Sequence, residues 1–178
     1  MASLNRRSVL LGGTAIVGAV AIGSFVSRSF GVDLGPPEGT PGPVPGTFEV
    51  THTDAEWQKI LGDDAFKVMR QQYTEAPGSS PLLNEHRAGT FACAGCDLAL
   101  FDASTKFDSG TGWPSFWQAL PNAAVTMSDT SLGMDRDEVH CRRCGGHLGH
   151  LFHDVPDQPM NNRYCMDGLA LKFVPGAA

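Results

Sequence analysis

The sequence is poor in charge and in clustered basic residues. Only 18% of its 178 residues are charged, and the formal net charge is −6. No group of lysines and arginines is larger than an adjacent pair. Because nucleic acids are bound through extended positive surfaces, this composition excludes a nucleic-acid partner. No internal repeat is present, which excludes solenoid architectures.

Short apolar runs separated by turn residues make up most of the chain, which contains 21 glycines and 12 prolines. The runs TFAC, LALF, AAVTM, DEVHC and LALKF are typical of short antiparallel strands. Before them, Thr53 predicts a helix N-cap, Glu56 completes a capping box and Gly62 ends the helix. A second short helix is expected to begin at Asp63 or Asp64. The sequence therefore predicts a mainly β domain preceded by two short helices.

The first thirty residues predict an export signal or a membrane anchor. Arg6 and Arg7 precede an uncharged run over residues 9–26, a pattern typical of twin-arginine signals, although such signals often carry Phe where this chain has Val9. A plain anchor or a Sec-type signal is the alternative, since about eighteen apolar residues suffice to cross a bilayer. The small-x-small sequence AVA at residues 19–21 leaves cleavage open. We expect export to the periplasm, or tethering that faces outside, with membrane contact only through an uncleaved segment.

A linker is predicted between this segment and the domain. Residues 31–47 are dense in proline and glycine and have almost no apolar side chains, as expected for a semi-extended tether. The domain is therefore expected to span residues 48–178.

Four of the five cysteines form two C-x-x-C pairs. Cys93 pairs with Cys96 and Cys141 pairs with Cys144, with 44 residues between the pairs. Two such turns can surround one ion with four thiolates, so we expect one structural Zn²⁺ per chain. Two redox sites or two disulfides are the alternatives, but a disulfide within a pair closes a small loop and stabilises little.

The fifth cysteine, Cys165, has no sequence partner. A lone cysteine is commonly a small buried hydrophobe. If residues 163–167 form a strand, however, Arg163 and Asp167 share one face with Cys165. A nearby guanidinium favours the reactive thiolate, which an ionised Asp167 would oppose.

Two further clusters can carry chemistry. The segment GGHLGHLFHD places His147, His150 and His153 at spacings of three, followed by Asp154; these residues could bind a metal, act as acids and bases, or simply bond to backbone carbonyls. The segment KFDSGTGWPSFW carries Trp113 on a tight turn, where an indole can form a binding surface or fill the core.

In this order, these motifs resemble those of the B-type peptide methionine sulfoxide reductases. The resemblance runs from about Phe48 to Phe173 and includes TEAPGSSPL, CAGCDLALF, KFDSGTGWPSF, GMDRDEVHCRRCGGHLGHLFHD and RYCMDGLALKF. It implies a fold of two twisted antiparallel sheets, a structural zinc site, and reduction of the R epimer of methionine sulfoxide. Oxidised proteins or peptides would be the substrates and a thioredoxin-like protein the reductant.

The resemblance also implies roles for individual residues. Cys165 would be the nucleophile, Arg163 would stabilise its thiolate, and Trp113 would contact the methyl group of the sulfoxide. His147 and His150 would hold and protonate the sulfoxide oxygen. The remaining matched positions are Asp154, expected to orient the histidines, and the substrate-binding residues Phe152 and Asp167.

The chain departs from the family pattern at two positions. Thr111 stands where many members carry a resolving cysteine, so we expect an external thiol to resolve the Cys165 sulfenic acid. Asp167 stands where the family usually has asparagine, and its charge should raise the pKa of the Cys165 thiol and slow attack.

Two other functions remain open at this stage. A metal-dependent oxidoreductase or hydrolase would use His147, His150 and His153 to hold a second ion. A non-catalytic zinc-bearing binding module would use Trp113 and Trp117 as a contact surface.

Overall fold

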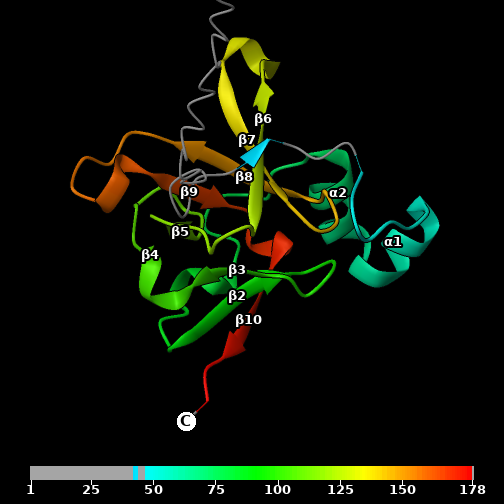
Figure 1. Cartoon of the computed structure of the whole chain (residues 1–178), viewed down its shortest axis with the longest axis horizontal. Helices are drawn as coiled ribbons and strands as arrows, with labels where there is room; N and C mark the ends of the chain where they lie inside the picture. The colour runs from blue at the N-terminus through cyan, green and yellow to red at the C-terminus, as the bar shows by residue number, and fades with distance from the viewer. Residues whose placement is uncertain (1–41, 44–46, 178) are drawn as a thin grey trace, which may run out of the picture. The chain divides into compact units, whose positions relative to one another are not determined.

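The structure is a computed structural model that describes residues 42–43 and 47–177 (Figure 1). The predicted export signal, residues 1–30, lies outside the described residues, as does most of the predicted linker. Among the described residues, no helix is both long enough and apolar enough to cross a bilayer.

Two short helices open the domain, as predicted. In α1 (Asp54–Leu61), the Thr53 hydroxyl accepts a hydrogen bond from the Glu56 amide, and the Glu56 carboxylate accepts one from the Thr53 amide. Gly62, at φ 75°, ends this helix and lets α2 (Asp63–Gln71) begin at once. The predicted capping box and helix stop are confirmed.

Two sheets form the body of the domain, confirming the predicted mainly β fold. The larger sheet has the strand order β1-β6-β7-β8-β9-β5-β4 and the smaller one β10-β2-β3. Every pairing is antiparallel except that of β1 with β6. The strands are β1 (Gly42–Pro43), β2 (Gly89–Cys93), β3 (Ala99–Asp102), β4 (Lys106–Phe107), β5 (Ser115–Phe116), β6 (Ala124–Asp129), β7 (Arg136–Cys141), β8 (His147–Phe152), β9 (Arg163–Met166) and β10 (Leu171–Pro175).

Single turns of 3-10 helix occur in several of the loops. They are η1 (Pro81–Asn84), η2 (Ala103–Thr105), η3 (Ser131–Gly133), η4 (Pro159–Asn161) and η5 (Gly168–Ala170). The β1 strand lies within the segment predicted as a linker, so at least residues 42–43 pair with the edge of the larger sheet.

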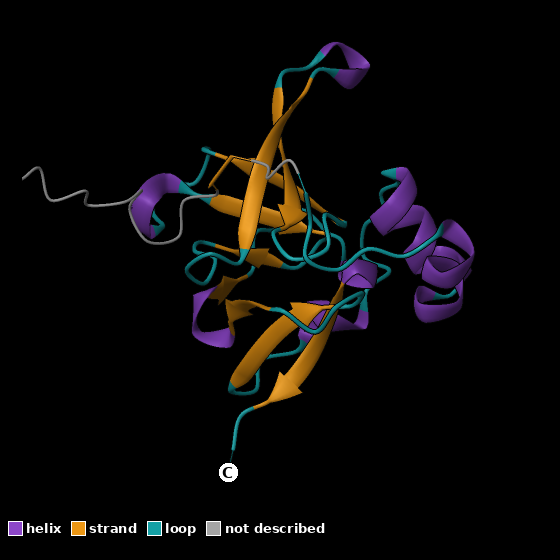
Figure 2. Ribbon diagram, turned by 45° about the vertical axis from the view of Figure 1, so that its right-hand side comes forward, coloured by secondary structure: helices purple, strands orange, loops and turns teal. Residues whose placement is uncertain are grey.

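The strands of the two sheets can be followed in Figure 2. Aromatic rings from both sheets form much of the core. Phe91 and Phe101 come from the smaller sheet, and Phe116 and Tyr164 come from the larger one; all four are fully buried. The rings of Phe101 and Phe116 stack at 4.3 Å between centroids, and Phe91 meets Phe116 edge-on at 4.9 Å. These contacts hold β5 and β9 against the smaller sheet.

A β-bulge in β8 brings two histidines to the same side of the sheet. His140 pairs with His147 and Val139 pairs with Gly149, so one residue of β8 has no partner on β7. In a regular strand, residues three apart face opposite sides, but here the rings of His147 and His150 lie 5.5 Å apart. The bulge therefore creates the histidine pair.

Gly149 permits the close approach of β8 to β9. Its φ is 143°, and a Cβ at this position would overlap the carbonyl oxygen of Cys165. In the resulting register His150 lies directly opposite Cys165. The sheet itself thus places a histidine beside the lone cysteine.

Candidate functional site

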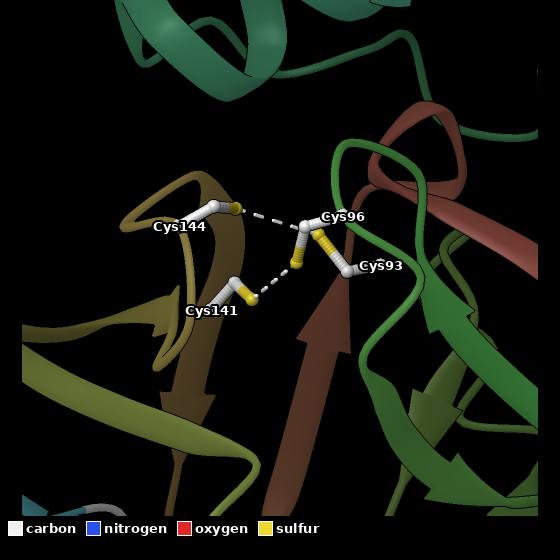
Figure 3. Close-up of side chains that lie close together, drawn as sticks. All are labelled: Cys93, Cys96, Cys141 and Cys144. Atoms are coloured by element: carbon white, nitrogen blue, oxygen red, sulfur yellow. Dashed lines mark hydrogen bonds between the residues drawn. The ribbon is translucent and has the colours of Figure 1, made fainter. Parts of the chain in front are cut away.

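The two C-x-x-C pairs meet in one cluster (Figure 3). The Sγ atoms of Cys93 and Cys144 lie 3.7 Å apart, those of Cys96 and Cys141 lie 3.5 Å apart, and all four sulfurs lie within 4.8 Å of one another. Tetrahedral Zn–S bonds of about 2.3 Å would place the sulfurs roughly 3.8 Å apart. The four residues therefore fit one tetrahedral ion that prefers thiolate ligands.

Matching backbone turns shape the two halves of this cluster. The residue after each second cysteine has a left-handed backbone, with φ 60° at Asp97 and 68° at Gly145. Their amides donate to the carbonyls of the first cysteines, Cys93 and Cys141, at 3.0 and 2.8 Å. Because one turn joins β2 to β3 and the other joins β7 to β8, an ion here links the two sheets.

Cys165 lies in the middle of β9, half-buried at the wall of a cavity of about 130 Å³. The cavity contains five of the residues that the sequence singled out. Its lining consists of Thr74, Trp113, Arg136, Gly149, His150, Phe152, Cys165 and Asp167. Arg163, Asp154 and His147 do not line it.

Arg163 is engaged by Asp154. Its Nε and Nη2 donate to the two carboxylate oxygens of Asp154 at 2.9 and 2.6 Å, and its guanidinium lies 4.3 Å from the ring centre of Phe152. Asp154 thus orients Arg163 directly, and its effect on the histidines stays a prediction. Since Phe152 pairs with Arg163 across the sheet, the chain that follows Phe152 carries Asp154 to the guanidinium.

His147 lies behind the cavity between two carboxylates. Its side chain is 2% exposed, its Nδ1 lies 2.5 Å from Glu138 Oε1, and its Nε2 lies 3.4 Å from Asp167 Oδ2. Burial alone would lower the pKa of His147, but the contacts with Asp167 and Glu138 outweigh it and raise the pKa to about 9. At neutral pH His147 is an imidazolium.

His150 and His153 have different surroundings. His150 Nε2 lies 2.9 Å from Asp129 Oδ2, and burial lowers the pKa of this histidine, which favours the neutral ring. His153 is 57% exposed, and its Nε2 lies 3.9 Å from Asp137 Oδ2. Within residues 47–177, neither possible metal-binding group contains His150 or His153, so the three-histidine metal site is not supported.

Glu138 is the main functional candidate that the sequence analysis missed. It is buried, and its Oε2 lies 3.2 Å from His140 Nε2 while its Oε1 contacts His147. Burial would raise its pKa, but the bonds to His140 and His147 lower it to about 2. The sequence did contain a sign of this role. In a strand that runs through Arg136 and DEVHC, every second residue shares a face, so Arg136, Glu138 and His140 lie together.

Glu138, His140 and His147 could also be considered as ligands of an ion. Nitrogen and oxygen ligands at about 2.0–2.1 Å from a tetrahedral ion would lie roughly 3.3 Å apart. The 2.5 Å contact between His147 and Glu138 is too short for two ligands of one ion, and a nitrogen and an oxygen this close need a proton between them. The geometry therefore favours a proton, not a metal, between them.

Trp113 is held at the opposite wall by the segment that follows α2. Its indole Nε1 donates to the Glu75 carbonyl at 3.2 Å, and the Glu75 amide donates to Asp167 Oδ1 at 2.9 Å. The Gly78 amide donates to the Gly112 carbonyl at 2.8 Å. Trp113 is half-buried and exposes part of its surface to the cavity, which agrees better with a binding surface than with a core residue.

The groups around Cys165 have opposing effects on the pKa of its thiol. Burial raises the pKa of its thiol, and the charge of Asp167 raises it further, whereas Thr111 and Arg163 lower it. The net result is a thiol whose pKa lies above its ordinary value, so only a small fraction is thiolate at neutral pH.

Comparison with known proteins places the domain among methionine sulfoxide reductases. Residues 61–175 match the family model described as the SelR domain. A protein of Leifsonia xyli subsp. xyli named peptide methionine sulfoxide reductase MsrB is 46% identical over 131 residues, covering 73% of this chain and 94% of that protein. Proteins with the same name from Methanosarcina barkeri and Pseudomonas putida are each 44% identical, covering 70% and 71% of this chain and 87% and 96% of their own lengths.

We predict that Glu138→Gln lowers the pKa of His147, because it removes the closer of the two carboxylates. The stabilisation from this pair is fully present between about pH 4.5 and 6.5; it is lost as pH falls toward the Glu138 pKa of about 2 or rises through the His147 pKa of about 9. NMR titration of the histidines and denaturant unfolding across this range measure both effects. Asp137→Asn, which alters an exposed carboxylate on the same strand, should leave the His147 titration unchanged.

Proposed function

The chain belongs to the SelR-domain family and is a peptide-methionine (R)-S-oxide reductase, and from this premise we propose that Cys165 is its nucleophile. The observation that supports this most is the cavity that joins Cys165 to Trp113 and His150. The other four cysteines lie together in the separate sulfur cluster.

In the first half of the reaction, the Cys165 thiolate attacks the sulfoxide sulfur. An S–S bond forms, and two protons delivered to the oxygen let it leave methionine as water. Water then attacks the Cys165 sulfur and loses one proton; the S–S bond breaks, methionine is released, and Cys165 remains as a sulfenic acid, so the net step consumes one proton. The positive charge of Arg163 favours the thiolate. Asp154 holds this guanidinium by two hydrogen bonds and so acts as a positioning residue.

The oxygen is held on the histidine side of the cavity. His150 lines the cavity, and in its protonated form it can donate from Nδ1 to the oxygen while Nε2 keeps its contact with Asp129; His147 supplies a positive charge from behind. Because the oxygen leaves only when protonated, an acid in this position is required. Trp113 and Phe152 supply aromatic faces for a methyl group that gains positive charge during attack.

An external thiol completes the cycle. We propose that a thioredoxin-like dithiol attacks the sulfenic acid, releasing water and forming a mixed disulfide, and that its second thiol then restores Cys165. Thr111 lies 3.7 Å from Cys165 Sγ, so the position of a resolving cysteine is close to the nucleophile but carries a hydroxyl. No intramolecular disulfide should accumulate during turnover, which mass spectrometry of the intermediate would reveal.

We also propose that the protein is exported, on the basis of Arg6 and Arg7 and the apolar segment that follows them. Sequencing the N-terminus of the protein from fractionated cells would show its location and whether the segment is removed; recovery from the cytoplasm alone would refute export.

For activity, we predict turnover of R-sulfoxide peptides and none of S-sulfoxide peptides with dithiothreitol as reductant. Cys165→Ser should abolish the reaction because the hydroxyl is a far weaker nucleophile than the thiolate. His153→Gln, which changes an exposed ring outside the cavity, is the matched control and should keep the wild-type rate. Residual R-epimer activity in folded Cys165→Ser protein would disprove the assigned nucleophile.

For Asp167, we predict that Asp167→Asn increases the rate at neutral pH. Removing the carboxylate lowers the pKa of the Cys165 thiol and so raises the thiolate fraction. The contact with Glu138 remains and keeps His147 charged. The measurement is kcat/KM between pH 6 and 9; identical profiles for variant and wild type would contradict this electrostatic argument.

For the sulfur cluster, we propose that Cys93, Cys96, Cys141 and Cys144 hold one structural Zn²⁺, which supplies cross-linking and takes no part in catalysis. Elemental analysis should find about one zinc per chain. Cys96→Ser should lose zinc and unfold at a lower denaturant concentration, whereas Cys165→Ser should keep both the metal and the stability. Unchanged stability of a metal-free Cys96→Ser protein would argue against this role.

A further inference from the structure

Three hydroxyl groups form a chain that ends at the nucleophile. Thr111 Oγ1 lies 3.7 Å from Cys165 Sγ and 2.8 Å from Ser109 Oγ. Ser109 Oγ lies 2.7 Å from Ser115 Oγ, which in turn donates to the Trp113 carbonyl at 3.1 Å. Ser115 is fully buried. None of these serines was singled out from the sequence.

Two features of the fold place these three hydroxyl groups beside Cys165. Ser115 lies directly opposite Cys165 in the β5–β9 pairing. The turn before β5 then folds back over Cys165, with left-handed backbone at Gly110 and Gly112. Thr111, between these glycines, is thereby brought to the sulfur.

The protons along this chain can be arranged in two ways. With a thiol, the S–H donates to Thr111, Thr111 to Ser109, Ser109 to Ser115, and Ser115 to the Trp113 carbonyl. With a thiolate, each hydroxyl turns round: Ser115 donates to Ser109, Ser109 to Thr111, and Thr111 to the sulfur. Compared with the thiol arrangement, the thiolate arrangement lacks only the hydrogen bond to the Trp113 carbonyl. The hydroxyl groups keep their protons, and only the thiol proton is lost.

We propose that Thr111, backed by Ser109 and Ser115, stabilises the Cys165 thiolate by this reversal of hydrogen-bond direction. Thr111 contacts the reacting atom directly, while the two serines are positioning residues that act through it. The inference rests on the proposed role of Cys165 as the nucleophile. It gives Thr111 a chemical role at the position where a resolving cysteine would otherwise stand.

Several other charged groups surround Cys165 and act on the same ionisation. Arg163 favours the thiolate, but two of its donors are already bonded to Asp154. Asp167 opposes the thiolate, and His150 and Arg136 line the same cavity. Neutral donors are useful here because they stabilise the sulfur without adding another charge to a site with several carboxylates nearby.

The test is the pH dependence of Cys165 alkylation by iodoacetamide in the full chain, followed by mass spectrometry of the peptide that contains Cys165. Because the thiolate then loses a hydrogen bond from a hydroxyl, Thr111→Val should raise the thiol pKa by about one unit or more. Alkylation at pH 7 should then slow about ten-fold or more. Thr111→Ser keeps the hydroxyl and should react like wild type.

A serine variant distinguishes a chain of three hydroxyl groups from a single hydrogen bond between Thr111 and Cys165. Ser115→Ala should shift the pKa in the same direction by a smaller amount, with roughly a three-fold slower alkylation at pH 7. The control is Ser128→Ala, which removes an exposed hydroxyl on β6 that bonds to Asp135. This control should not change the thiol pKa.

Two results would overturn the proposal. Equal thiol pKa values in Thr111→Val and Thr111→Ser would show that the hydroxyl does not support the thiolate. A shift in Thr111→Val with none in Ser115→Ala would leave a single bond and refute the chain. Alkylation needs no turnover, so these results stand apart from the proposed function, which fails instead if Cys165→Ser keeps R-sulfoxide reductase activity.

Discussion

The attachment of the two sheets to each other at the four-cysteine cluster is the constraint on which the site depends. One pair of sulfurs follows β2 and the other follows β7, so the cluster fixes the end of one hairpin against the other. β8 begins three residues after Cys144, and its bulge, its histidines and its register with β9 all follow from that starting point. Cys165 is thus positioned through β8 by residues that lie apart from the cavity.

Paired charges lie in the cavity wall and behind it. Arg163 is matched by Asp154, Arg136 by Asp129, and His147 by Glu138. Asp167 adds one more carboxylate, which His147 partly compensates. Asp167 therefore lies near Cys165 with an opposing charge, that of His147, buried behind it.

Local and short-range features of the structure could be predicted from the sequence. The capping box at Thr53 depends on residues three apart. The C-x-x-C pairs predict a four-thiolate metal site from their spacing alone. The positions of Arg163 and Asp167 beside Cys165 could be predicted from the alternation of side chains along a strand. Glu138 and the partner of Asp154 could not be predicted, because both depend on which strands are neighbours and on a bulge that shifts their register. The hydroxyl chain was missed since serine and threonine are common in turns and carry no signal of their own.

The cavity beside Cys165 is continuous in its walls with two larger hollows. A pocket of about 310 Å³ shares Trp113 with it, and one of about 350 Å³ shares Thr74, Arg136 and His150. A side chain that enters the small cavity therefore leaves the neighbouring residues of its own polypeptide facing these two hollows, where they have surface to contact.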